Sequence, residues 1–542
     1  MSGPRIDLVV IGQVLVAARH GRIQRAEAIG IGGGRVLLAG TAADVTEAAP
    51  AARVISEPGS AVVPGLHDFH LHLVGMARAR REVQLDGLDG AAVVAALRKA
   101  VDRTPRDAWV RGRGWSEAAM QALTLASLND LLRDVAVLVY SHDGHSAWAS
   151  PAALHRAGLR RDAGDPPGGR IERDAAGVAN GVLRESATDV VESRAASLAG
   201  PALDEALDEV AAALAASGVT GCTDAGDTSP DGGSGEFAAL GDRASLLLAA
   251  GNRLGGRLRV SVGFPADAIP AAAELGLATG ALLPGTQTVR VGWAKAYADG
   301  ALGSRTAAIF EPYTCGPRDT GILRLEPAEL DALMASSRAA GIGLAVHAIG
   351  DRAVAAVLDA VARAGPATEG GPHPRMEHLQ LMRRADRERL PTLSVTASVQ
   401  PVHCAADREH VEACWRDRAE LAYPFASLRA AGARLAFGSD SPIETADPWL
   451  GVFAAVHRRL PGDGTPDWHP AEALSAADAL GAYTTGRAAA AGRPDEGHLG
   501  PGAVADLAVL NVDLETLLAA DERLAEVRSL LTLVAGREVH RA

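Results

Sequence analysis

Lysine is almost absent from this chain of 542 residues, whose 53 basic residues include only two lysines, Lys99 and Lys295. Acidic residues number 66, so the formal net charge is −13 at pH 7. This balance argues against a protein that binds nucleic acid or an anionic membrane, because both usually need a basic surface. Apolar residues make up 48% and charged residues 22%, which is typical of a soluble globular protein and not of a disordered chain.

Cysteines and long apolar runs are also scarce. The four cysteines form neither a CxxC pair nor a close cluster, so the sequence indicates no zinc ribbon and no disulfide framework, and we expect a reducing cytoplasm as the location: Cys222, Cys315, Cys404 and Cys414. The apolar run 8–18 is interrupted by Gln13 and favours a strand over an export signal. No stretch approaches the length that spans a bilayer. A small molecule is the expected partner, and a homodimer is compatible with the composition.

Two familiar enzyme motifs are missing from the sequence. An acyl-enzyme hydrolase would carry a GxSxG elbow, and the sequence has none. A flavin or nicotinamide enzyme would place GxGxxG between a strand and a helix. The glycines at 30–34 are not followed by a helical pattern, so they favour a hairpin.

Both ends of the chain have the pattern of short strands separated by turns. The runs 7–17, 25–31 and 34–39 at the start and 505–511 and 531–539 at the end predict one small β-sandwich domain. We assign it residues 1–60 and 490–542, so that the two termini meet in one domain.

Between these ends, short β-branched runs alternate with Ala- and Leu-rich helical stretches, which is typical of βαβ units. Eight strands are expected, at 61–65, 218–223, 258–263, 288–296, 343–347, 375–378, 394–400 and 434–440. Eight is the number of a (β/α)₈ barrel, so we predict an α/β fold of this type over 61–489. The long interval after the first strand predicts an insertion at about 75–215 over the barrel mouth, where loops tolerate added segments.

Polar side chains stand at the ends of several predicted strands. His70 and His72 are two residues apart in an extended segment and point to one side, as capture of one zinc-like ion requires. Other candidates follow separate strands, and these strand ends converge on one face of a barrel: Lys295, His347, His378 and Asp440. Each has a structural alternative, such as a Lys295 paired with Asp299 or Glu311, or an Asp440 that caps a helix.

The ordered set resembles the amidohydrolase superfamily. The strings that begin at Lys295, His347, Glu377, Gln400 and Gly438 are similar to its family 3 branch, which contains N-substituted formamide deformylases and YtcJ-like proteins. The similarity covers nearly the whole chain. It implies that His70, His72 and Asp440 hold one metal ion, that His347 and His378 hold a second, and that a carboxylated Lys295 bridges the two. Zinc is the expected metal, with one or two ions per chain.

The resemblance also implies a reaction. A metal-bound hydroxide attacks an amide carbonyl, and Asp440 acts first as a base and then as an acid. Asp440, His378 and His403 are the expected catalytic residues, and four residues are candidates for substrate binding: Trp115, His145, Arg352 and His403. We expect a hydrolase of carbon–nitrogen bonds other than peptide bonds, with an N-acyl or N-formyl substrate. The alternatives are a deaminase or cyclic-amide hydrolase, a metal-dependent decarboxylase, and an inert scaffold.

Overall fold

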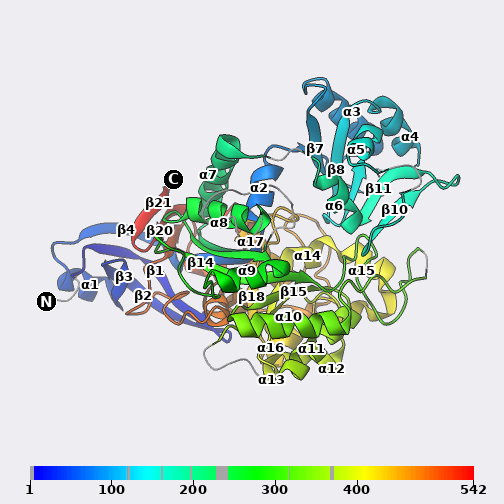
Figure 1. The fold of residues 1–542 in the computed structure, drawn as a ribbon. Helices are drawn as coiled ribbons and strands as arrows, with labels where there is room; N and C mark the ends of the chain where they lie inside the picture. Colours follow the sequence, from blue (N-terminus) through cyan, green and yellow to red (C-terminus); the bar gives the residue numbers. More distant parts are fainter. Residues whose placement is uncertain are drawn as a thin grey trace.

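The computed structural model describes residues 5–116, 119, 122–159, 163–195, 198–226, 242–316, 318–365 and 371–542. These residues form a central parallel barrel, a sheet built from both ends of the chain on one side of it, and a separate α/β unit that projects beyond the barrel mouth (Figure 1). Within the described residues no helix is both long and apolar enough to cross a membrane.

The barrel consists of eight strands that pair in parallel with their neighbours. They are β5 (Leu66–Leu71), β12 (Val219–Asp224), β13 (Arg259–Pro265), β14 (Val289–Tyr297), β15 (Leu344–Ala348), β16 (Arg375–His378), β17 (Thr396–Val399) and β18 (Arg434–Phe437). The two outer strands meet where the backbone N–H of Asp440 donates to the carbonyl of His70 at 2.6 Å. The prediction of a (β/α)₈ barrel is confirmed, and seven of its strands begin within two residues of the expected positions.

Helices cover the outside of this barrel because each has one apolar face. In α7 (Gly200–Ala216), Leu203, Leu207, Val210 and Leu214 are buried at helical spacing. The other helices between strands are α8 (Asp242–Leu254), α9 (Ile269–Glu274), α10 (Pro327–Ala340), α11 (Asp351–Ala364), α12 (Arg384–Arg387), α13 (Arg389–Thr392), α14 (Pro401–Ala406), α15 (Arg408–Cys414) and α16 (Phe425–Ala430). After β18 come α17 (Pro448–His457), α18 (Ala476–Gly481) and α19 (Arg487–Ala490).

The prediction that residues 61–65 form the first barrel strand is wrong, because the barrel starts with the next strand along the chain. Residues up to Pro64 belong to β4 (Arg53–Pro64), where Val62 and Val63 pair with the C-terminal strand β19 (Leu507–Leu510). The barrel begins only at Leu66. Gly65 lies at the crossing between the two sheets. A side chain would not fit at this position, because a Cβ would lie 2.1 Å from the Thr220 hydroxyl oxygen.

Strands from both ends of the chain share one seven-stranded sheet, in the order β21-β20-β19-β4-β1-β2-β3. The remaining members are β1 (Leu8–Arg19), β2 (Arg22–Gly32), β3 (Arg35–Gly40), β20 (Ser529–Val534) and β21 (Arg537–Arg541), with α1 (Ala42–Ala48) and α20 (Leu514–Ala519) beside them. A bridge between Arg35 and Val504 brings the far edge back towards β19. The sheet thus folds over a core of its own that includes Val10, Ile29 and Leu507.

The segment after α2 (Leu73–Ala79) forms a unit with its own six-stranded sheet, in the order β10-β11-β9-β8-β7-β6. Its strands are β6 (Val83–Gln84), β7 (Trp109–Trp115), β8 (Ala136–Ser141), β9 (Ser146–Ala149), β10 (Gly169–Arg173) and β11 (Ala179–Glu185). Its helices are α3 (Gly90–Val101), α4 (Ala122–Leu131), α5 (Pro151–Arg156) and α6 (Ser186–Glu192). The turn between β8 and β9 carries residues 142–145 to the barrel mouth, so this unit supplies one wall of the pocket described below.

Cys315 and Cys414 form a disulfide, although the sequence indicated no disulfide framework. The sequence does not show this pair because 99 positions separate its members. The bond joins the loop after β14 to the end of α15. Cys222 and Cys404 are free and buried. The expectation of a cytoplasmic location therefore loses the support that it drew from the cysteines.

Breaking this bond is expected to lower stability. A cross-link across a loop of this length contributes about 2–5 kcal/mol. Thermal unfolding should therefore show a lower Tm for Cys414→Ser than for the wild type, and a strong reductant should lower the wild-type Tm but not that of the variant. A wild-type Tm that does not respond to reductant would contradict the pairing.

Candidate metal centre

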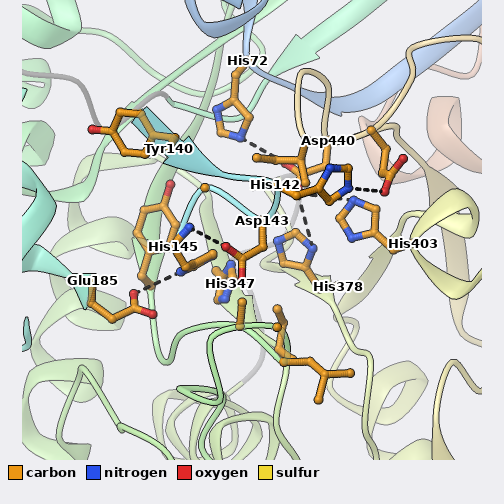
Figure 2. Close-up of a pocket in the computed structure, with 18 of the residues that line it drawn as sticks. His72, Tyr140, His142, Asp143, His145, Glu185, His347, His378, His403 and Asp440 are labelled. Atoms are coloured by element: carbon orange, nitrogen blue, oxygen red, sulfur yellow. Dashed lines mark hydrogen bonds and ion pairs between the residues drawn. The ribbon is translucent and has the colours of Figure 1, made fainter. Parts of the chain in front are cut away.

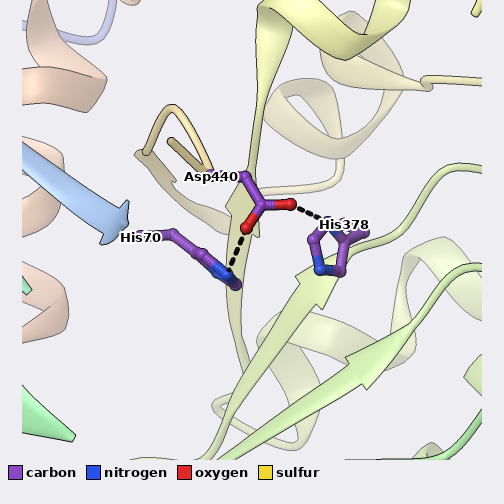
Figure 3. Close-up of side chains that lie close together, drawn as sticks. All are labelled: His70, His378 and Asp440. Carbon is purple, nitrogen blue, oxygen red and sulfur yellow. Dashed lines mark ion pairs between the residues drawn. The ribbon is translucent and has the colours of Figure 1, made fainter. Parts of the chain in front are cut away.

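Three imidazoles converge on the carboxylate of Asp440 at the carboxyl ends of the barrel strands. Asp440 Oδ1 lies 3.1 Å from Nε2 of both His70 and His72, and Oδ2 lies 4.0 Å from Nδ1 of His378. One ligand atom each from His70, His378 and Asp440 fit within 4.8 Å of one another (Figure 3). His70 is the next-to-last residue of β5, His378 ends β16 and Asp440 follows β18, so parallel pairing alone brings these distant positions together.

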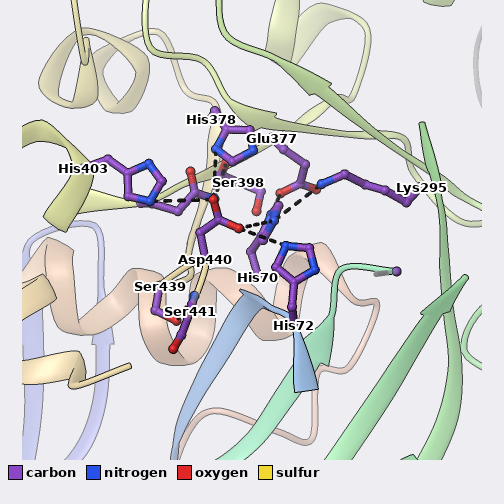
Figure 4. Close-up of polar contacts among 12 residues, drawn as sticks. His70, His72, Lys295, Glu377, His378, Ser398, His403, Ser439, Asp440 and Ser441 are labelled. Carbon is purple, nitrogen blue, oxygen red and sulfur yellow. Dashed lines mark hydrogen bonds and ion pairs between the residues drawn. The ribbon is translucent and has the colours of Figure 1, made fainter. Parts of the chain in front are cut away.

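The proton on His70 is fixed by a buried carboxylate. Glu377 Oε2 lies 2.5 Å from His70 Nδ1 (Figure 4). Arg375 donates to both oxygens of Glu377. Although burial acts to raise it, Arg375 and His70 hold the pKa of Glu377 well below its usual value. An ionised carboxylate only accepts, so Nδ1 carries a hydrogen, and in the neutral ring Nε2 then presents a lone pair towards Asp440.

His347 and His378 also present nitrogen lone pairs. His347 Nε2 donates to the Gly300 carbonyl at 3.1 Å, which leaves Nδ1 as the acceptor. His378 Nδ1 is buried and has no hydrogen-bond partner in the part of the chain that the structure describes. Burial first, and neighbouring positive groups second, hold the pKa of both residues well below its usual value, so both rings are neutral. Their ring centroids lie 4.5 Å apart.

Lys295 stands at the inner edge of this group. It is 4% exposed, and its Nζ lies 3.5 Å from His70 Nε2. Burial lowers its pKa. The alternative pairing with Asp299 is wrong, because that carboxylate accepts the backbone N–H groups of Ala308, Ile349 and Gly350 instead. Among the described residues no carboxylate forms an ion pair with Lys295, so its amine remains available to the centre.

These residues fit a divalent cation. Neutral imidazoles with fixed lone pairs and an ionised carboxylate are the donors that zinc and related metals take. When the His70 ring is neutral with its hydrogen on Nδ1, Nε2 and Asp440 Oδ1 are both acceptors 3.1 Å apart, an approach that a cation between them would stabilise. The unpartnered Nδ1 of His378 points to the same need.

A pocket of about 240 Å³ opens above the centre. Figure 2 shows His145 and His403 in it, together with His72, His347, His378 and Asp440. His403 lies in the first turn of α14. Its Nε2 lies 3.7 Å from Asp440 Oδ2, and its Nδ1 lies 3.4 Å from the Gln380 amide nitrogen. The structure thus brings His145, His403 and all the expected metal ligands except His70 into the lining, and His70 lies directly beneath it.

Two expected substrate contacts are not there. Trp115 is buried in the core of the inserted unit, and its indole N–H donates to the Val139 carbonyl at 2.9 Å. Arg352 lies in the first turn of α11 and does not line the pocket. Trp115 ends β7 of the inserted sheet, and its side chain packs into the core of that unit instead of facing the pocket.

His145 reaches the barrel from the inserted unit. Its Nδ1 lies 3.0 Å from Glu185 Oε2, and its ring centroid lies 5.3 Å from that of His347. Although burial acts to lower it, the Glu185 carboxylate raises the pKa of His145 to about 9. Glu185 also accepts from the Thr306 hydroxyl and from Arg324. The pocket therefore contains a cationic imidazole beside the centre at neutral pH.

The model of the amidohydrolase family matches residues 54–540. The chain belongs to the amidohydrolase family. This amidohydrolase is 30% identical in sequence to YtcJ of Bacillus subtilis (strain 168), over 91% of each chain. It is 28% identical to the N-substituted formamide deformylase of Arthrobacter pascens, over 98% of this chain and 97% of that one. A solved structure of an uncharacterized metal-dependent hydrolase from Pyrococcus horikoshii is 26% identical, with a TM-score of 0.73 over 95% of this chain and 99% of that one.

The sequence interpretation of this amidohydrolase missed two acidic residues, Glu377 and Glu185. Glu377 has a signal in hindsight, because Arg375 and Glu377 are two residues apart on β16 and therefore face the same side of the strand. Glu185 has none: it ends a strand of the inserted sheet, and only the folded chain shows that it meets His145.

Replacing Glu377 by Gln is expected to weaken metal binding at the candidate centre of the amidohydrolase. The amide no longer fixes the His70 tautomer, and outer partners of this kind are worth about 10–100-fold in metal affinity. It also leaves Arg375 buried without its counter-charge, which costs about 3–5 kcal/mol. Competition with a chelator and thermal unfolding measure the two effects. Metal affinity equal to that of the wild type would show that Glu377 only balances the charge of Arg375.

Proposed function

We propose that the protein is a metal-dependent hydrolase that cleaves the carbon–nitrogen bond of an N-acyl or N-formyl amide. The observation that carries this proposal is the convergence of His70, His72 and His378 on one ionised carboxylate, with the lone pairs of His70 and His347 fixed by their partners. The relationship to an N-substituted formamide deformylase supports the choice of bond.

His70, His72 and Asp440 would hold one divalent ion, and His347 and His378 a second, with Lys295 between them as a carboxylated bridge. Zinc is the metal that this donor set suits best. When bound, the metal polarises a carbonyl oxygen and lowers the pKa of a water towards 7.

Asp440 moves the proton. Its Oδ1 is engaged by two imidazoles at 3.1 Å, whereas Oδ2 has His403 Nε2 at 3.7 Å and His378 Nδ1 at 4.0 Å. Oδ2 is therefore the freer oxygen of a residue that lines the pocket. It accepts the proton of the attacking water and returns it to the leaving nitrogen, so that one group acts as base and then as acid.

His403 and His145 position the substrate from opposite walls. His403 Nε2 has no hydrogen-bond partner among the described residues, so it is available to an oxygen of the substrate. His145 offers Nε2 on the other side, held by Glu185. Both would orient the scissile carbonyl and stabilise negative charge that develops on its oxygen.

The test is a substrate panel run on protein whose metal content has been measured. N-formyl and N-acyl amides, cyclic amides, aminopurines and carboxylic acids are incubated with protein that contains zinc and with chelated protein. Release of amine and carboxylate from the first group, only when metal is present, is the expected result. Ammonia from aminopurines would show a deaminase, and carbon dioxide a decarboxylase. Full activity in metal-free protein would overturn the proposal.

A further inference from the structure

A second cavity of about 450 Å³ lies at the opposite end of the barrel from the metal centre. Two of its arginines begin barrel strands, Arg259 in β13 and Arg290 next to the start of β14. Two more come from the segment after α18, Arg487 and Arg493. Four guanidinium groups thus surround one cavity in a chain whose overall charge is −13.

Two of these arginines have acidic partners. Arg259 donates to both oxygens of Asp506, and Arg487 Nη1 lies 2.6 Å from Glu496 Oε2. Four cations against these two carboxylates leave two positive charges. Arg487 is 5% exposed, and its Nε has no hydrogen-bond partner within the described ranges, so one buried donor remains unused as well.

The other two arginines share a neutral acceptor. Arg290 Nη1 donates to the Gly280 carbonyl at 2.9 Å, and Arg493 Nη2 donates to the same oxygen. Neither forms an ion pair with a carboxylate of the described residues. Burial, and next the Arg493 guanidinium, lower the pKa of Arg290. Two like charges held together at one carbonyl repel each other, and the carboxylates of Glu496 and Asp495 counter this without forming an ion pair with either arginine in the described part of the chain.

We propose that this cavity binds an oxyanion, and specifically a phosphate group, either free or carried by a small ligand. The forked N–H groups of arginine match phosphate oxygens in pairs, and a doubly charged anion would neutralise the two surplus cations. The volume leaves room for more than the phosphate itself. The site lies at the amino ends of the strands and does not depend on the proposed hydrolase function.

Thermal unfolding and calorimetry of the full chain test this proposal, with inorganic phosphate, glycerol phosphate and glycerol as probes and chloride to keep ionic strength constant. Binding at one site per chain with a Tm increase of about 2 °C or more is expected for a phosphate-containing probe far above its Kd. A response to inorganic phosphate alone identifies the free ion as the ligand, and a stronger response to glycerol phosphate identifies a carried group. An equal response to glycerol, or none to any probe, overturns the proposal.

The test variant carries both Arg290→Gln and Arg493→Gln. The control is Arg98→Gln, on the exposed side of α3. In buffer without oxyanions the double variant should unfold at the wild-type temperature or above, because the repulsion between the two guanidinium groups has been removed. Its Kd for phosphate should be at least tenfold higher than that of the wild type. The control should respond as the wild type does. A double variant that is destabilised without any anion, or that still binds phosphate as tightly, would show that the two arginines only support the Gly280 loop.

Discussion

Asp440→Asn is expected to lower kcat by about 10²–10⁴-fold while most of the bound metal stays in place. The amide keeps an oxygen where Oδ1 contacts His70 and His72, so a ligand atom remains. It cannot accept a proton at the position of Oδ2. The substitution therefore separates the two roles that the geometry gives to this residue.

The measurement compares metal content per chain with kcat on the best amide of the panel. The matched control is Asp351→Asn, since Asp351 is a buried aspartate that accepts a backbone N–H from Phe310 outside the pocket. This variant should keep both metal and turnover. If Asp440→Asn loses metal and activity in the same proportion, Asp440 is a ligand only, and the base must be sought elsewhere in the pocket.

The barrel could be predicted because its strands are short, apolar and bounded by turns. The error at its first strand has a physical cause. Val62 and Val63 are as apolar as a barrel strand, and periodicity does not show whether they pair with β12 or with β19, which is more than 440 residues away in sequence. Long-range pairing decides the boundary, and only Gly65 marks the crossing.

Most of the centre could be predicted for a related reason. His70, His347 and His378 lie at or near the ends of barrel strands, and the fold alone brings such positions together. The walls of the pocket follow no such rule. His145 and Glu185 meet through the inserted sheet, and the register of that sheet has no counterpart in the barrel pattern. The place of Trp115 in the core of the inserted unit depends on the same sheet.

Lys295→Arg is expected to abolish turnover and to reduce the metal content by about half, although the positive charge is retained. The structure supplies the conditions for a carbamate. The amine is buried, its pKa is lowered by that burial, and it lies 3.5 Å from His70 Nε2. A neutral amine adds carbon dioxide to give an anionic bridge, whereas a guanidinium stays charged and unreactive.

The chain contains its own control, because the only other lysine, Lys99, is exposed near the end of α3. Lys99→Arg should change neither metal content nor kcat. Native mass spectrometry of the wild type should show the added mass of one carbon dioxide, which Lys295→Arg loses and Lys99→Arg keeps. If Lys295→Arg binds two metal ions and turns over like the wild type, Lys295 is not a bridge. If it binds one ion and retains turnover, the catalytic ion is the one held by His70, His72 and Asp440, and the second ion is dispensable.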